Sequence, residues 1–283
     1  MEKAAKITGA SLETAKTDYI LGTNADELYR LEFQHGVWRE TVLDCWRRAG
    51  IKAGARILDV GAGPGYATID LATMAGPSGQ VIALERSINF LAAARERIAA
   101  SGFKNVEIRS LDLMQDLMPA QTMDFAWCRW VNSFVASPGT LIKKIHAALR
   151  PGGTAIFFEY VDYASWRLLP HEPMLNEFVT RVMASWRETG GEPDVAPAVV
   201  AALHASGFKI TSARPHVFCA RPGESFWQWL EMFTEVNTAR SLEAGAVTRD
   251  WAGSFVARMD AARKSSNSLM ITPMVLEIIA RRE

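Results

Sequence analysis

Two spacings of apolar residues alternate along the centre of the chain. Short apolar runs typical of buried strands occur at 56–60, 81–84, 106–110, 125–128 and 154–159. The stretches between the first three runs, and between the last two, contain apolar residues at helical spacing. Because strands that alternate with helices are joined by right-handed crossovers, this order predicts an α/β fold with a parallel sheet.

The flanking regions follow other patterns. Apolar residues at helical spacing predict one long helix over about 24–49, which Gly50 is well placed to end. After residue 160 the helical stripes at 173–190 and 223–264 alternate with β character at 208–218 and 268–280. We therefore expect three parts: an N-terminal helical lid at 1–50, a sheet domain built from 51–172, 191–222 and 265–283, and helical cap insertions at 173–190 and 223–264.

Composition narrows the class of protein. Basic and acidic residues balance at 31 each, and no long basic run occurs, so we expect no nucleic-acid partner. The chain has no apolar signal segment and no run of the ~18–20 apolar residues that a membrane span needs, which predicts a cytoplasmic protein without a membrane span. The three cysteines are far apart, which predicts neither a metal site nor disulfides, with Cys45 and Cys219 in the core. No pattern indicates an oligomeric state.

The glycine-rich turn after the first strand is the most informative motif. Gly61, Gly63 and Gly65 follow the apolar run directly, and glycine lets the backbone bend tightly and leaves room for a ligand. The order G-x-G-x-G differs from the G-x-G-x-x-G of dinucleotide sites, because Tyr66 stands at the third glycine position. Asp59 before the turn suits a ligand with a cationic amino group. An ordinary βα turn of another α/β enzyme is the alternative interpretation.

Charged residues also follow the next three strands. Glu85 lies about twenty residues past the glycines, where a carboxylate can accept hydrogen bonds from ribose hydroxyls. Asp112 could accept from an adenine amino group while Leu113 packs on the ring. Arg129 closes the fourth strand, where it could contact a ligand anion or pair with Asp59 or Glu159. The alternative interpretations are an exposed loop carboxylate for Glu85 and a turn residue for Asp112.

Over about 51–160 these motifs together resemble the class I S-adenosylmethionine (SAM) dependent methyltransferases, in the small-molecule branch related to quinone and sterol methyltransferases. The resemblance implies a Rossmann-like, seven-stranded, mostly parallel sheet with an α-helical cap, with SAM as cofactor and S-adenosylhomocysteine as product. Residues 19–22 with Arg30 and Gln34 also resemble the lid that precedes the glycine motif in such enzymes. The implied cofactor-binding residues are Tyr19, Gln34, Asp59, Gly61, Ala62, Gly63, Gly65, Glu85, Arg86, Asp112, Leu113 and Arg129.

The chain departs from the family pattern at two places. Glu85 replaces the more common Asp, and Arg129-Trp130-Val131-Asn132 stands where enzymes that methylate amino groups of bases or glutamine carry Asn-Pro-Pro-Tyr. The second departure argues against a DNA or RNA amino methylase.

The resemblance therefore implies methyl transfer, by in-line displacement, to a small acceptor that is largely apolar or aromatic. Trp130 and Tyr160 are the expected acceptor contacts, joined by a minority of the aromatic residues in the cap. No catalytic residue is indicated, although His171 or His216 could be a general base. Two other functions stay open at this point: a SAM-binding fold used for cyclase or lyase chemistry, and a non-enzymatic protein that senses SAM.

Overall fold

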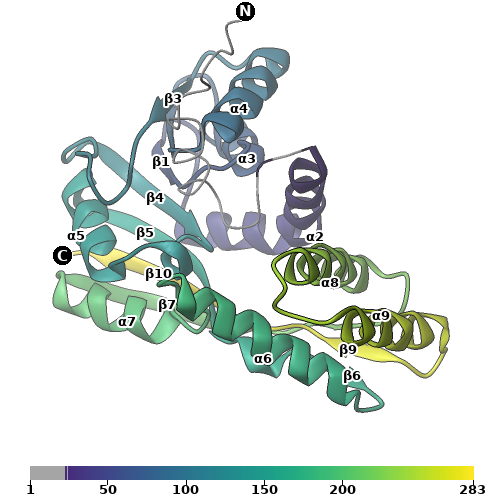
Figure 1. The fold of residues 1–283 in the computed structure, drawn as a ribbon. Coiled ribbons are helices and arrows are strands. Elements are labelled where there is room, and N and C mark those ends of the chain that lie inside the picture. The colour runs from purple at the N-terminus through teal and green to yellow at the C-terminus, as the bar shows by residue number, and fades with distance from the viewer. Residues whose placement is uncertain (1–22, 24) are drawn as a thin grey trace, which may run out of the picture.

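The computed structural model describes residue 23 and residues 25–283. Its main sheet has seven strands in the order β3-β2-β1-β4-β5-β10-β7 (Figure 1). The bounds of these strands are β1 Arg56–Val60, β2 Gln80–Glu85, β3 Val106–Ser110, β4 Met123–Arg129, β5 Leu149–Asp162, β7 Phe208–His216 and β10 Met274–Arg282.

Strand β1 lies at the point where the order of the sheet reverses. It pairs in parallel with β2 on one side and with β4 on the other, and β4 pairs in parallel with β5. Only β10 runs against its neighbours, antiparallel to both β5 and β7. The predicted seven-stranded, mostly parallel sheet is confirmed. In such sheets ligands bind outside the carboxyl ends of the strands at the reversal point, which is here the end of β1 and β4.

Alternate residues of the central strands pack against helices on opposite faces of the sheet. Ile57 belongs to the core cluster that contains residues of α2 and α3, whereas Leu58 belongs to the cluster that contains residues of α5 and α7. This period of two is what a strand buried on both faces requires. The helices are α2 Ala25–Ala49, α3 Tyr66–Ala75, α4 Ile88–Ser101 next to α3, α5 Pro138–Ala148 and α7 Ala196–Ala205.

A second group of elements lies below α2, in the lower right part of Figure 1. It contains α6 Pro173–Glu188, α8 Ser225–Glu243 and α9 Arg249–Lys264. A small antiparallel sheet in the order β6-β9-β8 accompanies these helices. Its strands are β6 Arg167–Leu169, β8 Cys219–Ala220 and β9 Leu269–Ile271, and the short 3-10 helices η2 Asn132–Phe134 and η3 Tyr163–Ser165 lie on the connections from the main sheet.

The small sheet was not predicted, because strands of two or three residues are too short to show an alternating pattern. The β-like stretch at 268–280 is two strands, β9 and β10, in two different sheets. The expectation that Cys219 is a core residue is wrong. Its side chain is exposed on β8, whereas Cys45 is buried as expected.

Of the helices that the structure describes, none combines the length and the apolar character that crossing a membrane would need.

Candidate functional site

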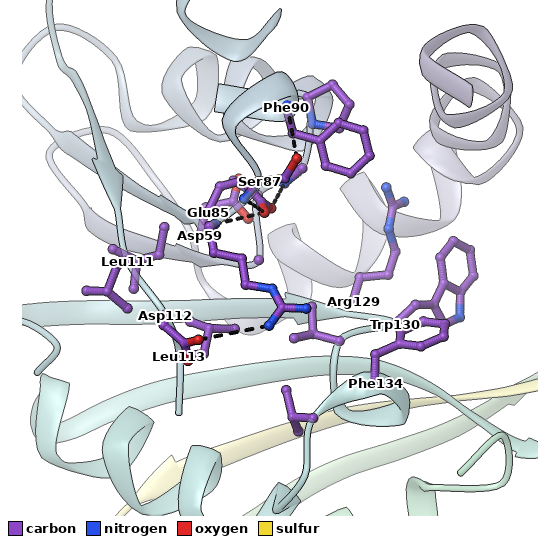
Figure 2. A pocket seen from close by; sticks show the side chains of 18 of the residues that line it. Asp59, Glu85, Ser87, Phe90, Leu111, Asp112, Leu113, Arg129, Trp130 and Phe134 are labelled. Atoms are coloured by element: carbon purple, nitrogen blue, oxygen red, sulfur yellow. Dashed lines mark hydrogen bonds and ion pairs between the residues drawn. The ribbon is translucent and has the colours of Figure 1, made fainter. Parts of the chain in front are cut away.

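A pocket of about 500 Å³ lies at the carboxyl ends of β1, β2 and β4, as Figure 2 shows. The glycine turn forms its floor, and the segment after β3 and the loop after β4 form two of its sides. Most of the residues that the sequence singled out line it: Gln34, Asp59, Gly61, Ala62, Gly63, Glu85, Arg86, Asp112, Leu113, Arg129 and Trp130.

Two glycines of the turn have different surroundings. Gly63 has φ of 56°, and a Cβ atom at this position would meet nothing within 4 Å, so the backbone borders open space in the pocket. At Gly65 a Cβ atom would lie 3.1 Å from the Cβ of Ala94 on α4. Gly65 therefore allows the start of α3 to pack against α4, and it does not line the pocket.

Asp59 is a buried carboxylate near the floor of the pocket. Its side chain accepts a hydrogen bond of 2.6 Å from the hydroxyl of Thr68, in the first turns of α3. Burial raises the pKa of Asp59 to about 6, and the nearby charge of Glu85 acts in the same direction. Thr68 and Arg129 oppose this rise. A ligand cation beside the carboxylate would likewise offset the cost that burial and Glu85 impose on its charge.

Glu85 connects the end of β2 to the glycine turn. Its Oε2 accepts a hydrogen bond of 2.8 Å from the backbone nitrogen of Gly63. Its Oε1 accepts from the backbone nitrogens of Arg86 and Ser87, at 2.8 and 2.9 Å. A carboxylate offers about four acceptor positions, so one position on Oε2 is left for a ligand.

Asp112 combines a turn role with exposure to the pocket. Its Oδ1 accepts hydrogen bonds from the backbone nitrogens of Met114 and Gln115, at 2.7 and 3.2 Å. Its Oδ2 lies 3.9 Å from the guanidinium of Arg86. The turn interpretation and the ligand interpretation are thus compatible, since each uses a different oxygen. Leu111 and Leu113 line the pocket on either side of this carboxylate.

Arg129 is a buried cation at the carboxyl end of β4. Burial lowers its pKa to about 10, and the negative charges nearby, that of Asp59 first, counteract this effect. Within the described part of the chain its buried Nη1 has no hydrogen-bond partner. Its Nη2 lies 3.3 Å from Nδ1 of His35, and its Cζ lies 5.0 Å from the centre of the Trp130 ring. Because an unpaired buried donor is costly, this atom suits a ligand anion, and with Asp59 it suits a ligand end that carries both charges.

Trp130 continues the wall of the pocket after Arg129. It has φ of 52°, a conformation that is uncommon for a bulky residue. Its ring stacks on Tyr160 with the ring centres 5.6 Å apart, and on Trp229 of α8 with 5.9 Å between centres. Tyr160 does not line the pocket and lies behind Trp130 instead. Of the two expected acceptor contacts, the structure therefore brings Trp130 alone to the pocket wall.

The remaining candidates lie elsewhere. Gln34 lines the pocket from α2, and its Oε1 accepts from Nε1 of Trp229 at 3.0 Å. Tyr19 lies outside the described residues. Neither His171 nor His216 lines the pocket: His171 is exposed, and Nε2 of His216 lies 3.0 Å from Oε2 of Glu277.

Sequence reasoning missed part of the lining. Ser87 and Phe90 follow the predicted Glu85 and could have been added from the rule that ligands bind at strand ends. Thr189 and Gly190, at the end of α6, carry no local signal for a site. From the residues expected to form the cap, these two are the ones that reach the pocket. The other missed residues are Leu31, Pro64, Tyr66, Ala67, Leu84, Leu111, Met114, Gln115, Trp127, Val131, Phe134, Val135 and Ala136.

Comparison with known proteins agrees with this geometry. Residues 57–153 match the family model described as a methyltransferase domain. This part of the chain is therefore similar to methyltransferase domains. It is also 32% identical to a demethylmenaquinone methyltransferase from Geobacillus kaustophilus (strain HTA426) over 126 residues, which cover 44% of this chain and 53% of the relative. The chain thus matches about half the length of this curated relative.

Solved structures extend the likeness of fold beyond the methyltransferase domain. The cyclase SpnF superposes with a TM-score of 0.55 at 20% identity, over 86% of this chain and 80% of SpnF. Geranyl diphosphate C-methyltransferase from Streptomyces coelicolor A3(2) superposes with a TM-score of 0.54 at 12% identity, over 88% of this chain and 82% of that enzyme. At such identities the superpositions describe a shared fold.

Proposed function

We propose that the protein is a SAM-dependent methyltransferase of class EC 2.1.1 that acts on a small, largely apolar or aromatic acceptor. The observation that carries the proposal is the pocket at the reversal point of the sheet, which Asp59 and Arg129 line together with Glu85 and Asp112. Among the described residues, Nη1 of this arginine has no partner. Further support comes from the matched methyltransferase domain and from the solved geranyl diphosphate C-methyltransferase, which is in complex with S-adenosylhomocysteine.

The charged residues fit the parts of SAM in an extended orientation. Asp59 would face the ammonium group and Arg129 the carboxylate. Glu85 would accept from the ribose hydroxyls through the free position on Oε2, and a contact through both oxygens would require one backbone bond to Oε1 to be shared. Oδ2 of Asp112 would accept from the adenine amino group. Leu111, Leu113 and Phe90 would enclose the ring, as apolar side chains commonly do in ligand sites.

The bound cofactor would supply the activated methyl group, so this chain's own residues have to bind, orient and exclude water. The wall beyond Arg129 consists of Trp130, Phe134, Val135, Ala136 and Thr189, which carry no charge. Such a wall favours a flat, neutral acceptor. Because the relatives over the matched residues are named demethylmenaquinone methyltransferases, a quinol-like ring is the first acceptor to test.

The helical segments at 1–50, 173–190 and 223–264 would cover the acceptor side, with Tyr19 as part of the lid. Thr189 and Gly190 at the pocket wall support this arrangement for α6, and the hydrogen bond between Gln34 and Trp229 supports it for α2 with α8.

Two measurements test the proposal. Calorimetric titration with SAM and S-adenosylhomocysteine should give binding of both, and incubation with methyl-labelled SAM and reduced naphthoquinones or other aromatic acceptors should give labelled product with one S-adenosylhomocysteine per methyl group. Binding of neither nucleoside would refute the proposal. If SAM binds tightly and is not consumed while an acceptor is cyclised or cleaved, the protein has non-methyl chemistry instead. Binding of SAM without any turnover would indicate a sensor.

A further inference from the structure

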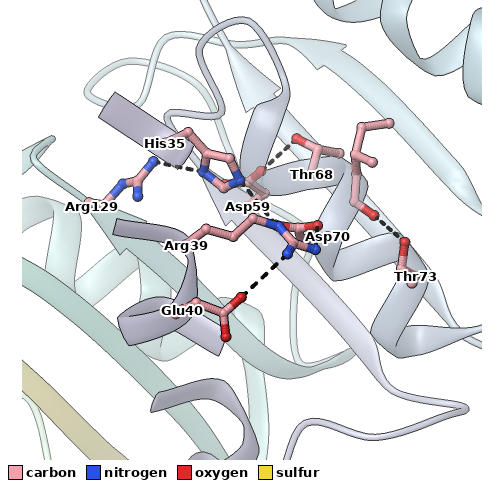
Figure 3. A network of polar contacts seen from close by, with 9 residues as sticks. His35, Arg39, Glu40, Asp59, Thr68, Asp70, Thr73 and Arg129 are labelled. Atoms are coloured by element: carbon pink, nitrogen blue, oxygen red, sulfur yellow. Dashed lines mark hydrogen bonds and ion pairs between the residues drawn. The ribbon is translucent and has the colours of Figure 1, made fainter. Parts of the chain in front are cut away.

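A chain of polar side chains connects the outer surface of α2 and α3 with the pocket (Figure 3). Arg39 on α2 contacts Asp70 on α3 through two hydrogen bonds, of 2.8 and 2.9 Å. Oδ2 of Asp70 lies 3.0 Å from Nε2 of His35, which is also on α2. Nδ1 of His35 lies 3.3 Å from Nη2 of Arg129 at the end of β4. Four side chains from three elements thus form one continuous path.

The chemistry of the partners fixes the direction of each hydrogen bond in this path. A guanidinium can only donate, so Nδ1 of His35 accepts from Arg129. The proton of the neutral imidazole is then on Nε2, which donates to Asp70. Burial lowers the pKa of His35 and so favours this neutral form, although Asp70 opposes the shift. Arg39 holds both oxygens of Asp70 and thereby fixes the acceptor that orients the imidazole.

The path restrains Arg129 on one side and leaves its other side free. Nη2 is held by His35, and the ring of Trp130 lies against the guanidinium. Nη1 is buried and, among the described residues, has no partner, while Arg129 lines the pocket beside Asp59. Asp59 and Arg129 come from the adjacent strands β1 and β4, so they present opposite charges to the same end of the pocket.

We propose that His35, oriented by Asp70, is a positioning residue that directs Nη1 of Arg129 toward the carboxylate of the cofactor's amino-acid end. This inference rests on the proposed function. An arginine side chain has many rotamers, and a fixed acceptor behind its guanidinium confines it to the one in which the free nitrogen faces the ligand. The carboxylate, rather than an anionic acceptor, is the expected partner because Asp59 provides the matching site for the ammonium group next to it.

The test compares two ligands that differ only at the relevant end. S-adenosylhomocysteine has the amino-acid group, whereas methylthioadenosine is an adenosine thioether without it. In the whole chain, His35→Phe should lower the affinity for S-adenosylhomocysteine by about tenfold, as expected for one misdirected charge-assisted contact. The same substitution should change the affinity for methylthioadenosine by less than about twofold. His35→Gln can still accept from Arg129 and donate to Asp70, so it should restore most of the difference between the ligands. His146→Phe on α5 replaces a histidine outside the pocket and is the matched control.

A double-mutant cycle separates positioning from a general structural role. In an Arg129→Met background, His35→Phe should have no further effect on S-adenosylhomocysteine, because the residue through which it acts is gone. If His35→Phe does not fold, the affinities for the same two ligands are compared in Asp70→Asn, because asparagine has nearly the same shape as the aspartate it replaces.

Three results would overturn the inference. An equal loss of affinity for both ligands would mean that His35 only supports the fold. Unchanged affinities would mean that the orientation of Arg129 does not depend on His35. An unchanged ligand ratio with a raised KM for the methyl acceptor would mean that Arg129 serves the acceptor. A parent protein that binds neither ligand would refute the proposed function itself, which distinguishes the two failures.

Discussion

The carboxylate of Glu85 accepts a hydrogen bond of 2.8 Å from the backbone nitrogen of Gly63, so the end of β2 is joined to the turn that follows β1. The same carboxylate also accepts from the backbone nitrogens of Arg86 and Ser87. One side chain therefore holds both the glycine turn and the start of the loop after β2. A change at this residue should alter the geometry of the turn as well as the contact with a ligand.

Glu85→Ala should lower the affinity for SAM at least about tenfold, because a hydrogen bond to a charged group contributes ~1.5–3 kcal/mol. Calorimetric titration measures the effect. Glu107→Ala is the control, since Glu107 is an exposed carboxylate on the neighbouring β3 that pairs with Arg109. A Kd equal to that of the parent would remove Glu85 from the binding site.

Gly63→Leu should abolish SAM binding, because its side chain would enter the open space that the pocket provides at this position. The substitution also forces a leucine into a left-handed conformation. Gly102→Leu controls for that strain: Gly102 has φ of 73°, likewise has open space around its Cβ position, and lies after α4 outside the pocket. Equal SAM affinity in a folded Gly63→Leu protein would contradict the orientation proposed for the ligand.

The affinity for S-adenosylhomocysteine should fall as pH drops through the pKa of Asp59, which burial raises to about 6. The ionised carboxylate attracts the ammonium group, whereas the protonated acid does not, so binding is strongest above this pKa and is lost below it. Titrations from about pH 8 to about pH 5 measure the change. Asp59→Asn should remove this dependence, and methylthioadenosine, which has no ammonium group, should show little of it. A loss of the same size with methylthioadenosine would mean that another group is responsible.

Glu159→Gln should make the protein more stable at high pH. Glu159 is completely buried on β5, and its Oε1 accepts from the backbone nitrogens of Val131 and Asn132. Burial raises its pKa to about 7 from an ordinary 4.5, so the folded state holds the proton more tightly than the unfolded state. The stabilisation that this proton gives is complete below the ordinary value and is lost as pH rises through 7.

Glutamine keeps the accepting oxygen and carries no charge, so it reproduces the neutral form of this side chain at every pH. At about pH 8 the free energy of unfolding of Glu159→Gln should exceed that of the parent by up to about 3 kcal/mol, and the difference should vanish below about pH 4. Urea denaturation at both pH values measures it. A difference that does not depend on pH would contradict the titration of Glu159.

The parts of the site that the sequence predicted depend on local rules. Gly63, Glu85 and Asp112 each lie at or just beyond the carboxyl end of a strand, and parallel strands bring these ends to one edge of the sheet. Their positions could therefore be inferred from spacing alone. The fold class followed from the same alternation of strands and helices.

The parts that the sequence did not predict depend on contacts between distant residues. His35 has the appearance of a core histidine on an amphipathic helix, and only the packing of α2 against α3 and β4 brings it between Asp70 and Arg129. Thr189 reaches the pocket because of the direction in which α6 ends, which no pattern in residues 173–190 encodes. Tyr160 stacks on the ring of Trp130 and does not line the pocket, which the order of residues along the chain could not reveal.

The segment between β7 and β10 begins and ends at neighbouring backbone positions. It leaves the main sheet after His216 and returns at Val275, and the register of the two strands pairs these residues. Because its ends meet on adjacent antiparallel strands, such an excursion can lengthen, shorten or be exchanged during evolution without a shift in register, and the cost of closing a longer loop rises only slowly. α8 and α9 lie within this excursion, whereas residues 57–153 lie outside it. The architecture thus places α8 and α9 on a segment whose length and sequence can change while the strands around the pocket keep their register.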